Sequence, residues 1–204
     1  MTNTTAILSW RVTADPTRWL VIPREPNDEW KSVAQALVLQ TFVESRTELD
    51  SADLENEAKN YLETAARESV ANLIGFAEDA GATAAVVCAL GVAGRGPIPV
   101  LVMVYLNEGL HPSDLFDATG ARDPFSIYPP LIEYPNVEGC DALRITRIDV
   151  DGEGSAWASV TLARRTSITD TLLTWRTTDI PLLAVMPDLL DELLGSISVN
   201  EIFG

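Results

Sequence analysis

"TLLTWRTTDIPLLAVMPDLLDELLGSISV", residues 171–199, runs from an apolar strand through a proline turn into a leucine-rich helix. The apolar residues of the helical part recur at i, i+3, i+4, i+7, i+8 and i+11, which is the spacing of one helical face. They are Met186, Leu189, Leu190, Leu193, Leu194 and Ile197. Because a strand directly precedes this helix, we expect the helix to fold back onto its own sheet and close the core. A helix that extends toward a partner protein is the alternative.

Four apolar segments upstream of this helix have the pattern of β-strands. They are residues 83–92 (TAAVVCALGV), 98–106 (IPVLVMVYL), 142–150 (ALRITRIDV) and 155–163 (SAWASVTLA). Strands that follow one another through tight turns, such as the one at Asp151-Gly152, form an antiparallel sheet. The first two segments are apolar almost throughout, whereas a sheet covered on one face alternates, so we expect helices to cover much of both faces.

The N-terminal part combines two short extended segments with two helices. Residues 6–12 (AILSWRV) and 19–23 (WLVIP) flank a turn at Asp15-Pro16, which predicts a β-hairpin or a meander. Residues 27–45 have helical periodicity, and Asn27 or Asp28 can cap that helix. Since its second half is apolar nearly all round, a change from helix to strand near Leu37 is an alternative.

The clearest helix covers residues 51–81. Asp50 or Ser51 can accept the free amide hydrogens of its first turn, and Gly81 can end it in the left-handed conformation. Its buried face is predicted to contain Leu54, Ala58, Tyr61, Leu62, Ala65, Leu73, Ile74 and Ala77.

Together these elements predict an α+β fold. We expect a mainly antiparallel β-sheet flanked by helices, an α/β/α sandwich, in a single domain of residues 1–204 with a long loop insertion at residues 109–140. A chain of this length buries roughly 70% of the surface that its unfolded form exposes, so it needs no disulfide or metal to fold. Cys88 lies in an apolar run and is expected in the core, and whether it lies close to Cys140 is left open.

The 109–140 insertion is the first candidate for a functional surface. It contains five prolines and is expected to form neither helix nor strand. Its aromatic residues and one arginine are the candidate partner-binding residues, although the aromatic rings could equally pin the loop to the body of the protein. The set is Phe116, Arg122, Phe125, Tyr128 and Tyr134.

The charge of the chain excludes several classes of partner. Thirty acids against 14 bases give a formal net charge of −16, which repels nucleic-acid phosphates and anionic membranes, so we expect neither as a partner. The expected partner is another protein or a second copy of the chain. The first ten residues, MTNTTAILSW, lack the basic and long apolar regions of a signal peptide, and a cytoplasmic location is the expectation.

Three segments resemble ligand-binding motifs but fit simpler roles. Residues 149–154 have the alternating acids of a calcium loop, but the position that needs a bidentate carboxylate is Val160, so a hairpin turn is expected. The glycines of residues 91–97 lack the Lys-Ser/Thr of a P-loop. His111, the only histidine, lies near Asp114, Asp117 and Asp123. We therefore predict no metal site, no cofactor and no catalytic residue.

Five arginines fall in the C-terminal strands. They could gather on one edge and bind an acidic partner, but we expect them to pair with the surplus carboxylates instead. They are Arg144, Arg147, Arg164, Arg165 and Arg176.

The order of elements resembles the PsbP-like family, whose fold is an α/β/α sandwich. The residues that carry the resemblance are WLVIP at 19–23 and LLTWRTTDIPLLAVMPDLLDELLGSISV at 172–199, which is similar to the family's closing strand and helix. The resemblance implies a non-enzymatic binding or accessory protein and supplies no catalytic residue.

These observations predict a non-enzymatic protein whose function is to bind another protein. The alternative is a small enzyme or ligand-binding domain with a pocket under the 109–140 loop, using Asp114, Asp117, Arg122 or Tyr128. A homo-oligomeric structural protein is a third class.

Overall fold

The computed structural model describes residues 6–47, 56–106, 112–122, 126–150, 152–167 and 169–203. The fold is α+β, with an open antiparallel sheet and helices that pack against it, which confirms the predicted fold class. By contacts the chain forms two compact units, Asp15–Leu101 and the combination of Met1–Ala14 with Val102–Gly204. The single domain over residues 1–204 stays a prediction.

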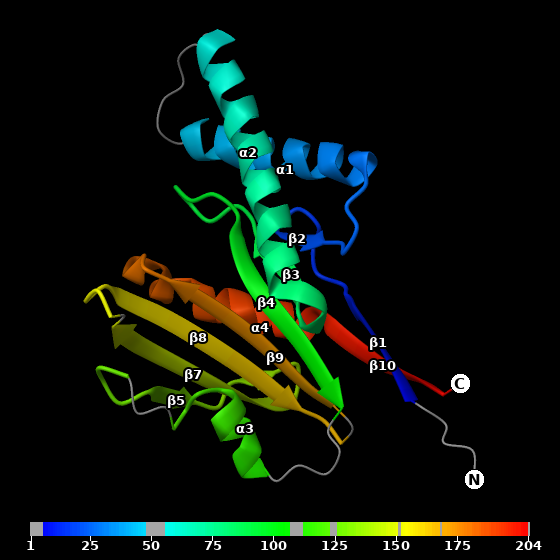
Figure 1. Ribbon diagram of the computed structural model, residues 1–204, viewed down its shortest axis with the longest axis vertical. Coiled ribbons are helices and arrows are strands. Elements are labelled where there is room, and N and C mark those ends of the chain that lie inside the picture. Colours follow the sequence, from blue (N-terminus) through cyan, green and yellow to red (C-terminus); the bar gives the residue numbers. More distant parts are fainter. Residues whose placement is uncertain are drawn as a thin grey trace. The chain divides into compact units, whose positions relative to one another are not determined.

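The Asp15–Leu101 unit consists of two helices and a short sheet (Figure 1). Strand β2 (Trp19–Ile22) pairs antiparallel with β3 (Ala85–Ala89), from Trp19 opposite Ala89 to Ile22 opposite Val86. The sheet order continues from β3 to β4 (Ile98–Leu106), whose later residues belong to the other unit. Helices α1 (Asp28–Thr47) and α2 (Asn56–Ala80) pack on each other, and α2 also contacts β2 and β3.

Helix α1 settles the alternative at Leu37, because the helix continues to Thr47. The side chain of Asn27 accepts a hydrogen bond of 2.8 Å from the backbone N–H of Trp30, as an N-cap does. Ala34, Val38 and Thr41 are buried at the helical spacing i, i+4, i+7. Burial of this stripe in the core that it shares with α2 keeps the apolar second half helical.

Helix α2 buries a stripe rotated from the predicted one. Leu62 and Leu73 are buried as expected, but Ala66 and Val70 lie between them, and Tyr61 is 65% exposed. The prediction for Tyr61 was therefore wrong. The small side chains of Ala66 and Val70 belong to the same core cluster as α1, where they allow the two helices to approach closely.

Both ends of α2 were predicted from single residues. Gly81 follows the helix with φ of +69° and begins η1 (Gly81–Thr83), which confirms the predicted left-handed ending. Asp50, Ser51 and Leu54 lie outside the described residues.

The other unit contains the larger part of the sheet. Its strand order is β4-β9-β8-β7-β5, with β6 (Asn136–Val137) paired to β7. The strands are β5 (Leu131–Glu133), β7 (Cys140–Val150), β8 (Ala156–Arg165) and β9 (Thr169–Thr177). Strands β7 and β8 form the predicted hairpin, from Val150 opposite Ala156 to Ala142 opposite Arg164.

Helix α4 (Met186–Ser196), which follows η2 (Ile180–Ala184), closes the core of this unit. It packs on β6, β8 and β9, and the exposed fraction of Leu190, Leu193 and Leu194 is 0%. Ile197, just beyond its end, is buried as well. The apolar face of the C-terminal helix therefore packs within its own unit, as its sequence predicted.

The predicted N-terminal hairpin was wrong. Strand β1 (Ala6–Val12) pairs with β10 (Ile197–Phe203) along its whole length, and β2 pairs with β3 instead. Between β1 and β2, Asp15 accepts hydrogen bonds from the backbone N–H (2.9 Å) and hydroxyl (2.7 Å) of Thr17. This turn separates β1 from β2. The backbone groups of β2 pair instead with those of the buried strand β3.

The prediction of no regular structure over residues 109–140 was also wrong in part. Helix α3 (Pro112–Ala118) starts at a proline, whose missing N–H is harmless in a first turn. Strands β5 and β6 span three and two residues, and pairing with β7 stabilises them. Such short elements leave no recognisable period in a sequence.

Truncation of Leu193 tests the closure of the core by α4. Leu193→Ala should lower the free energy of unfolding by about 2–5 kcal/mol, because it leaves a cavity in a fully buried site. Leu131→Ala, at an exposed leucine of the same unit, is the matched control and should change it by less than about 0.5 kcal/mol. Urea unfolding measures both, and equal effects would contradict the packing of α4.

Candidate functional site

The segment 126–134 runs along the outer side of β7. Ser126 forms a bridge with Asp149, and the N–H of Ile127 donates to the carbonyl of Ile148 at 2.9 Å. Pairing resumes at β5, where Leu131 lies opposite Thr146. The residues between include Pro129-Pro130, which lack N–H donors and so fit a bulge better than a paired strand.

Five large apolar side chains of this segment are exposed. We call them the β5 edge surface: Ile127, Tyr128, Leu131, Ile132 and Tyr134. Strand β5 is the last strand in the sheet order, so its outer backbone groups are not used by another strand of the sheet. An apolar row beside an open strand edge is the feature of the described surface that most needs a partner.

Sequence reasoning identified the two tyrosines of this surface but missed its three aliphatic residues. Exposed aromatic residues stand out in a proline-rich stretch, and Tyr134 is 67% exposed. The aliphatic residues read as ordinary strand residues, and only the position of β5 at the edge leaves them uncovered.

A salt-bridge network connects this edge to α4. Arg144 of β7 donates from Nε to Glu133 of β5 at 3.0 Å and from Nη1 to Asp191 of α4 at 3.0 Å. Burial raises the pKa of the Asp191 carboxyl above 3.8, and the neighbouring Arg144 charge only partly opposes it. Burial lowers the pKa of Arg144, but its hydrogen bond to Glu133 and the charges of both carboxylates outweigh it, so the net pKa is raised.

The turn that follows the edge surface is acidic and exposed. Glu138 and Asp141 are both exposed, and the N–H of Gly139 donates to the Asn136 side chain at 3.0 Å. A Cβ atom on Gly195 of α4 would lie 3.1 Å from Cγ of Glu138, so this turn packs closely on the end of α4. Negative charge therefore lies next to the apolar row.

Two more of the predicted partner-binding residues, Phe116 of α3 and Arg122 four residues beyond its end, contact each other. Nη1 of Arg122 lies 3.2 Å from Oδ1 of Asp117, and the Arg122 guanidinium lies 5.8 Å from the centre of the Phe116 ring. Phe116 is half-buried and Arg122 lies over its ring, so this ring is only partly exposed. Phe125 lies outside the described residues, as do the side chains of His111, Asp114 and Asp123.

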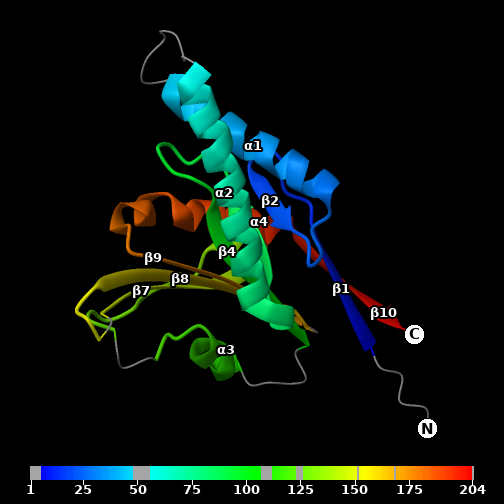
Figure 2. The ribbon, with the colours of Figure 1, turned by 45° about the horizontal axis from the view of Figure 1, so that its top comes forward.

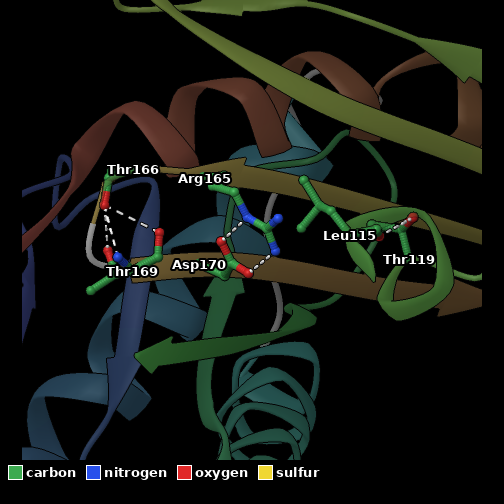
Figure 3. Close-up of polar contacts among 6 residues, drawn as sticks. All are labelled: Leu115, Thr119, Arg165, Thr166, Thr169 and Asp170. Atoms are coloured by element: carbon green, nitrogen blue, oxygen red, sulfur yellow. Dashed lines mark hydrogen bonds and ion pairs between the residues drawn. The ribbon is translucent and has the colours of Figure 1, made fainter. Parts of the chain in front are cut away.

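The sheet near α3 is polar but filled. Arg165 and Asp170 form a two-point ion pair of 2.7 and 2.5 Å, and Figure 3 shows Leu115 of α3 pointing toward it. Asp170 is only 6% exposed. A Cβ atom on Gly120 would lie 2.5 Å from Nη1 of Arg147, so the end of α3 leaves no room for a ligand at that point.

Three of the five arginines of the C-terminal strands pair with carboxylates, as expected, and the other two have different partners within this unit. Arg144, Arg147 and Arg165 form ion pairs with carboxylates. Arg164 donates to the carbonyl of Ile197 at 2.8 Å, and the Arg176 guanidinium lies 5.5 Å from the Trp157 ring. Their charges stabilise the sheet and do not form a cationic binding surface.

Two cavities of about 230 Å³ lie in the Asp15–Leu101 unit. One is mainly apolar, between the end of β2 and the end of α2, where Arg24 donates to the Ala82 carbonyl at 2.9 Å. The other is lined by residues of α1 and α2. Neither cavity is lined by residues of the 109–140 segment.

The described residues supply few groups for chemistry. Both cysteines are free, and burial raises the pKa of Cys88 to about 12, which keeps its thiol protonated and unreactive. Over the described parts of the chain, no three His, Cys, Asp or Glu side chains are placed to hold a metal ion. No described helix is both long and apolar enough to cross a membrane.

No protein-family model matches this chain, and no curated protein matches it. The β5 edge surface is therefore assigned from its geometry alone.

Asp191→Asn tests the salt-bridge network through pH. Because the folded pKa of Asp191 lies above its ordinary 3.8, the folded state binds more protons than the unfolded state just above that pH. The stability that protonated Asp191 contributes is fully present below pH 3.8 and is lost as the pH rises through the folded pKa. The unfolding free energy of the wild type minus that of the variant should therefore fall over this window in urea titrations.

Glu192→Gln, at an exposed acid of the same helix, is the control for that experiment. The difference in unfolding free energy between the wild type and Glu192→Gln should not show the fall expected for Asp191→Asn. A flat difference for Asp191→Asn would show that the carboxyl is not desolvated in the folded protein.

Proposed function

We propose that the protein is a non-enzymatic accessory protein that binds an extended segment of another protein along β5. The observation that carries the proposal is the group of exposed apolar residues on and beside β5, the last strand in the sheet order. A cytoplasmic location and membership of the PsbP-like family are part of the same proposal.

Strand addition explains why both features occur together. A segment that pairs with β5 would satisfy the outer backbone groups of that strand, and its successive side chains would lie beside Leu131 on one face of the sheet and Ile132 on the other. Tyr128 and Tyr134 flank the strand, and tyrosine contributes large contact area at low cost in conformational entropy. Backbone pairing supplies general affinity, and the flanking rings supply selectivity.

The charge of the chain selects the kind of segment. The net charge of −16 and the exposed Glu138 and Asp141 beside the edge disfavour an acidic partner. A segment that alternates basic and apolar residues places its apolar side chains on the row and its basic side chains near these carboxylates. Nucleic acid stays excluded because its phosphates would meet negative charge.

A displayed library of random linear peptides tests this proposal without knowledge of the natural partner. Selection on the intact protein should enrich peptides that alternate basic and apolar residues. Tyr134→Ala should weaken binding of an enriched peptide by about tenfold, as expected when an interface loses the large contact area of an exposed tyrosine. Fluorescence anisotropy of that labelled peptide measures the dissociation constants.

Tyr61→Ala is the matched control, since Tyr61 is 65% exposed on α2 and Tyr134 is 67% exposed beside β5. It should leave peptide affinity unchanged. Equal losses in both variants, or enrichment of acidic peptides, would overturn the proposal.

A further inference from the structure

The mainly apolar cavity of the Asp15–Leu101 unit lies where the pairing of β2 with β3 stops. Strand β2 lies beside α2 (Figure 2) and pairs with β3 as far as Ile22 opposite Val86. Pro23 follows, and because proline has no N–H and a fixed φ, the chain leaves the sheet there. The α2, η1 and β3 sides of the cavity are lined mostly by small residues, which leave about 230 Å³ unfilled: Ala77, Gly81, Ala82, Ala84 and Ala85.

The lining of this cavity has an apolar floor and a charged rim. Ile22 and Val86, at the floor, are 5% and 1% exposed. The exposed part of the lining contains its only two charged residues, Arg24 and Glu78. Half-buried apolar residues form the walls between floor and rim: Pro23, Pro26, Ile74, Ala77, Ala84 and Ala85. A ligand that matches this arrangement has an apolar body and a polar head group that faces the solvent.

The volume of the cavity limits the size of that ligand. Pockets for drug-sized ligands measure roughly 300–1,000 Å³, whereas an apolar cavity of roughly 150 Å³ accepts benzene. The cavity of about 230 Å³ lies between these sizes. It therefore has room for one benzene-sized group with a short tail.

The charges at the rim favour a cationic head group. Glu78 has no ion-pair or hydrogen-bond partner in the described part of the chain. Nη2 of Arg24 donates to the Ala82 carbonyl at 2.9 Å, so its charge offsets the negative carbonyl end of α2 and η1. The last turn of α2 contains no basic residue, and the exposed acids Glu25 and Asp79 adjoin the two charged lining residues in sequence. A cation is thus attracted to the rim, whereas a carboxylate meets negative charge there.

We propose that this cavity binds a small primary amine that carries an aromatic or branched apolar group. The apolar group packs on Ile22 and Val86, and the ammonium group lies at the rim within reach of Glu78. The cavity shares no residue with the β5 edge surface, so this site does not depend on whether a partner binds β5.

An NMR titration of the full chain with three probes of similar shape tests the head group. The probe 2-phenylethylamine should give saturable shifts at the amides of Ala84, Ala85 and Val86, which line the cavity. The neutral 2-phenylethanol should bind about two- to fivefold more weakly, which is the size of an exposed ion pair, and phenylacetate should bind more weakly still. Phenylacetate that binds as tightly as the amine, or an amine that gives no saturable shifts at these residues, would overturn the proposal.

Glu78→Gln tests which side chain holds the ammonium group. It should weaken binding of 2-phenylethylamine by about two- to fivefold and leave that of 2-phenylethanol unchanged, because only the amine loses an ion pair. Glu68→Gln is the matched control, since Glu68 is an exposed acid of the same helix about 15 Å away along its axis. Equal affinity for the amine in the two variants would contradict the role of Glu78.

Ala84→Leu tests the apolar part of the site independently of charge. The backbone of Ala84 is extended, with φ of −130° and ψ of 151°, so it accepts leucine without strain. The larger side chain occupies the cavity and should weaken binding of the amine and the alcohol alike by about tenfold, while urea unfolding shows that the variant is folded. Wild-type affinity for both probes in the folded variant would place the ligand elsewhere and overturn the proposal.

Discussion

Burial of the apolar face of α4 is the interaction on which the rest of its unit depends. Leu190, Leu193 and Leu194 are fully buried, and the helix packs on β6, β8 and β9. The chain passes from Ser196 directly into β10, so the position of α4 also fixes where the pairing of β10 with β1 begins. On the side of the edge strand, Asp191 of the same helix accepts from Arg144, which also holds Glu133 of β5. One buried helix thus helps to orient the edge strand that carries the candidate interaction surface.

The elements that could be predicted from sequence are those whose period is local. The leucines of α4, the strands β7 and β8 and the ending at Gly81 each follow from residues close together in the chain. The pairing of β1 does not, because its partner β10 lies at the opposite end of the sequence. The residues of segment 6–23 do not indicate that β2 pairs with β3. Two short strands around a turn predict a hairpin when only local sequence is considered. For α2, the periodicity predicted the helix but not which of its faces is buried, because alanine fits a buried face and an exposed face equally well.

Exposure is the property of the candidate site that sequence reasoning could reach only in part. Of the predicted residues, Tyr128 and Tyr134 lie on the exposed edge, whereas Phe116 and Arg122 contact each other beside Asp117. The sequence left both outcomes open, because an aromatic ring in a loop can anchor a partner or the loop itself. Whether such a ring is exposed depends on the position of β5 as the last strand of the sheet. That position follows from the tertiary pairing of β5 with β7.

The outer edge of β5 raises the question of how the protein avoids pairing with a second copy of itself, since an open edge pairs with any compatible strand. Charge gives a physical answer. Exposed carboxylates at Glu138 and Asp141 adjoin β5 in a chain of net charge −16, so a second copy is repelled there and a basic segment is attracted. Pro129-Pro130 shortens the length of β5 that is open to pairing.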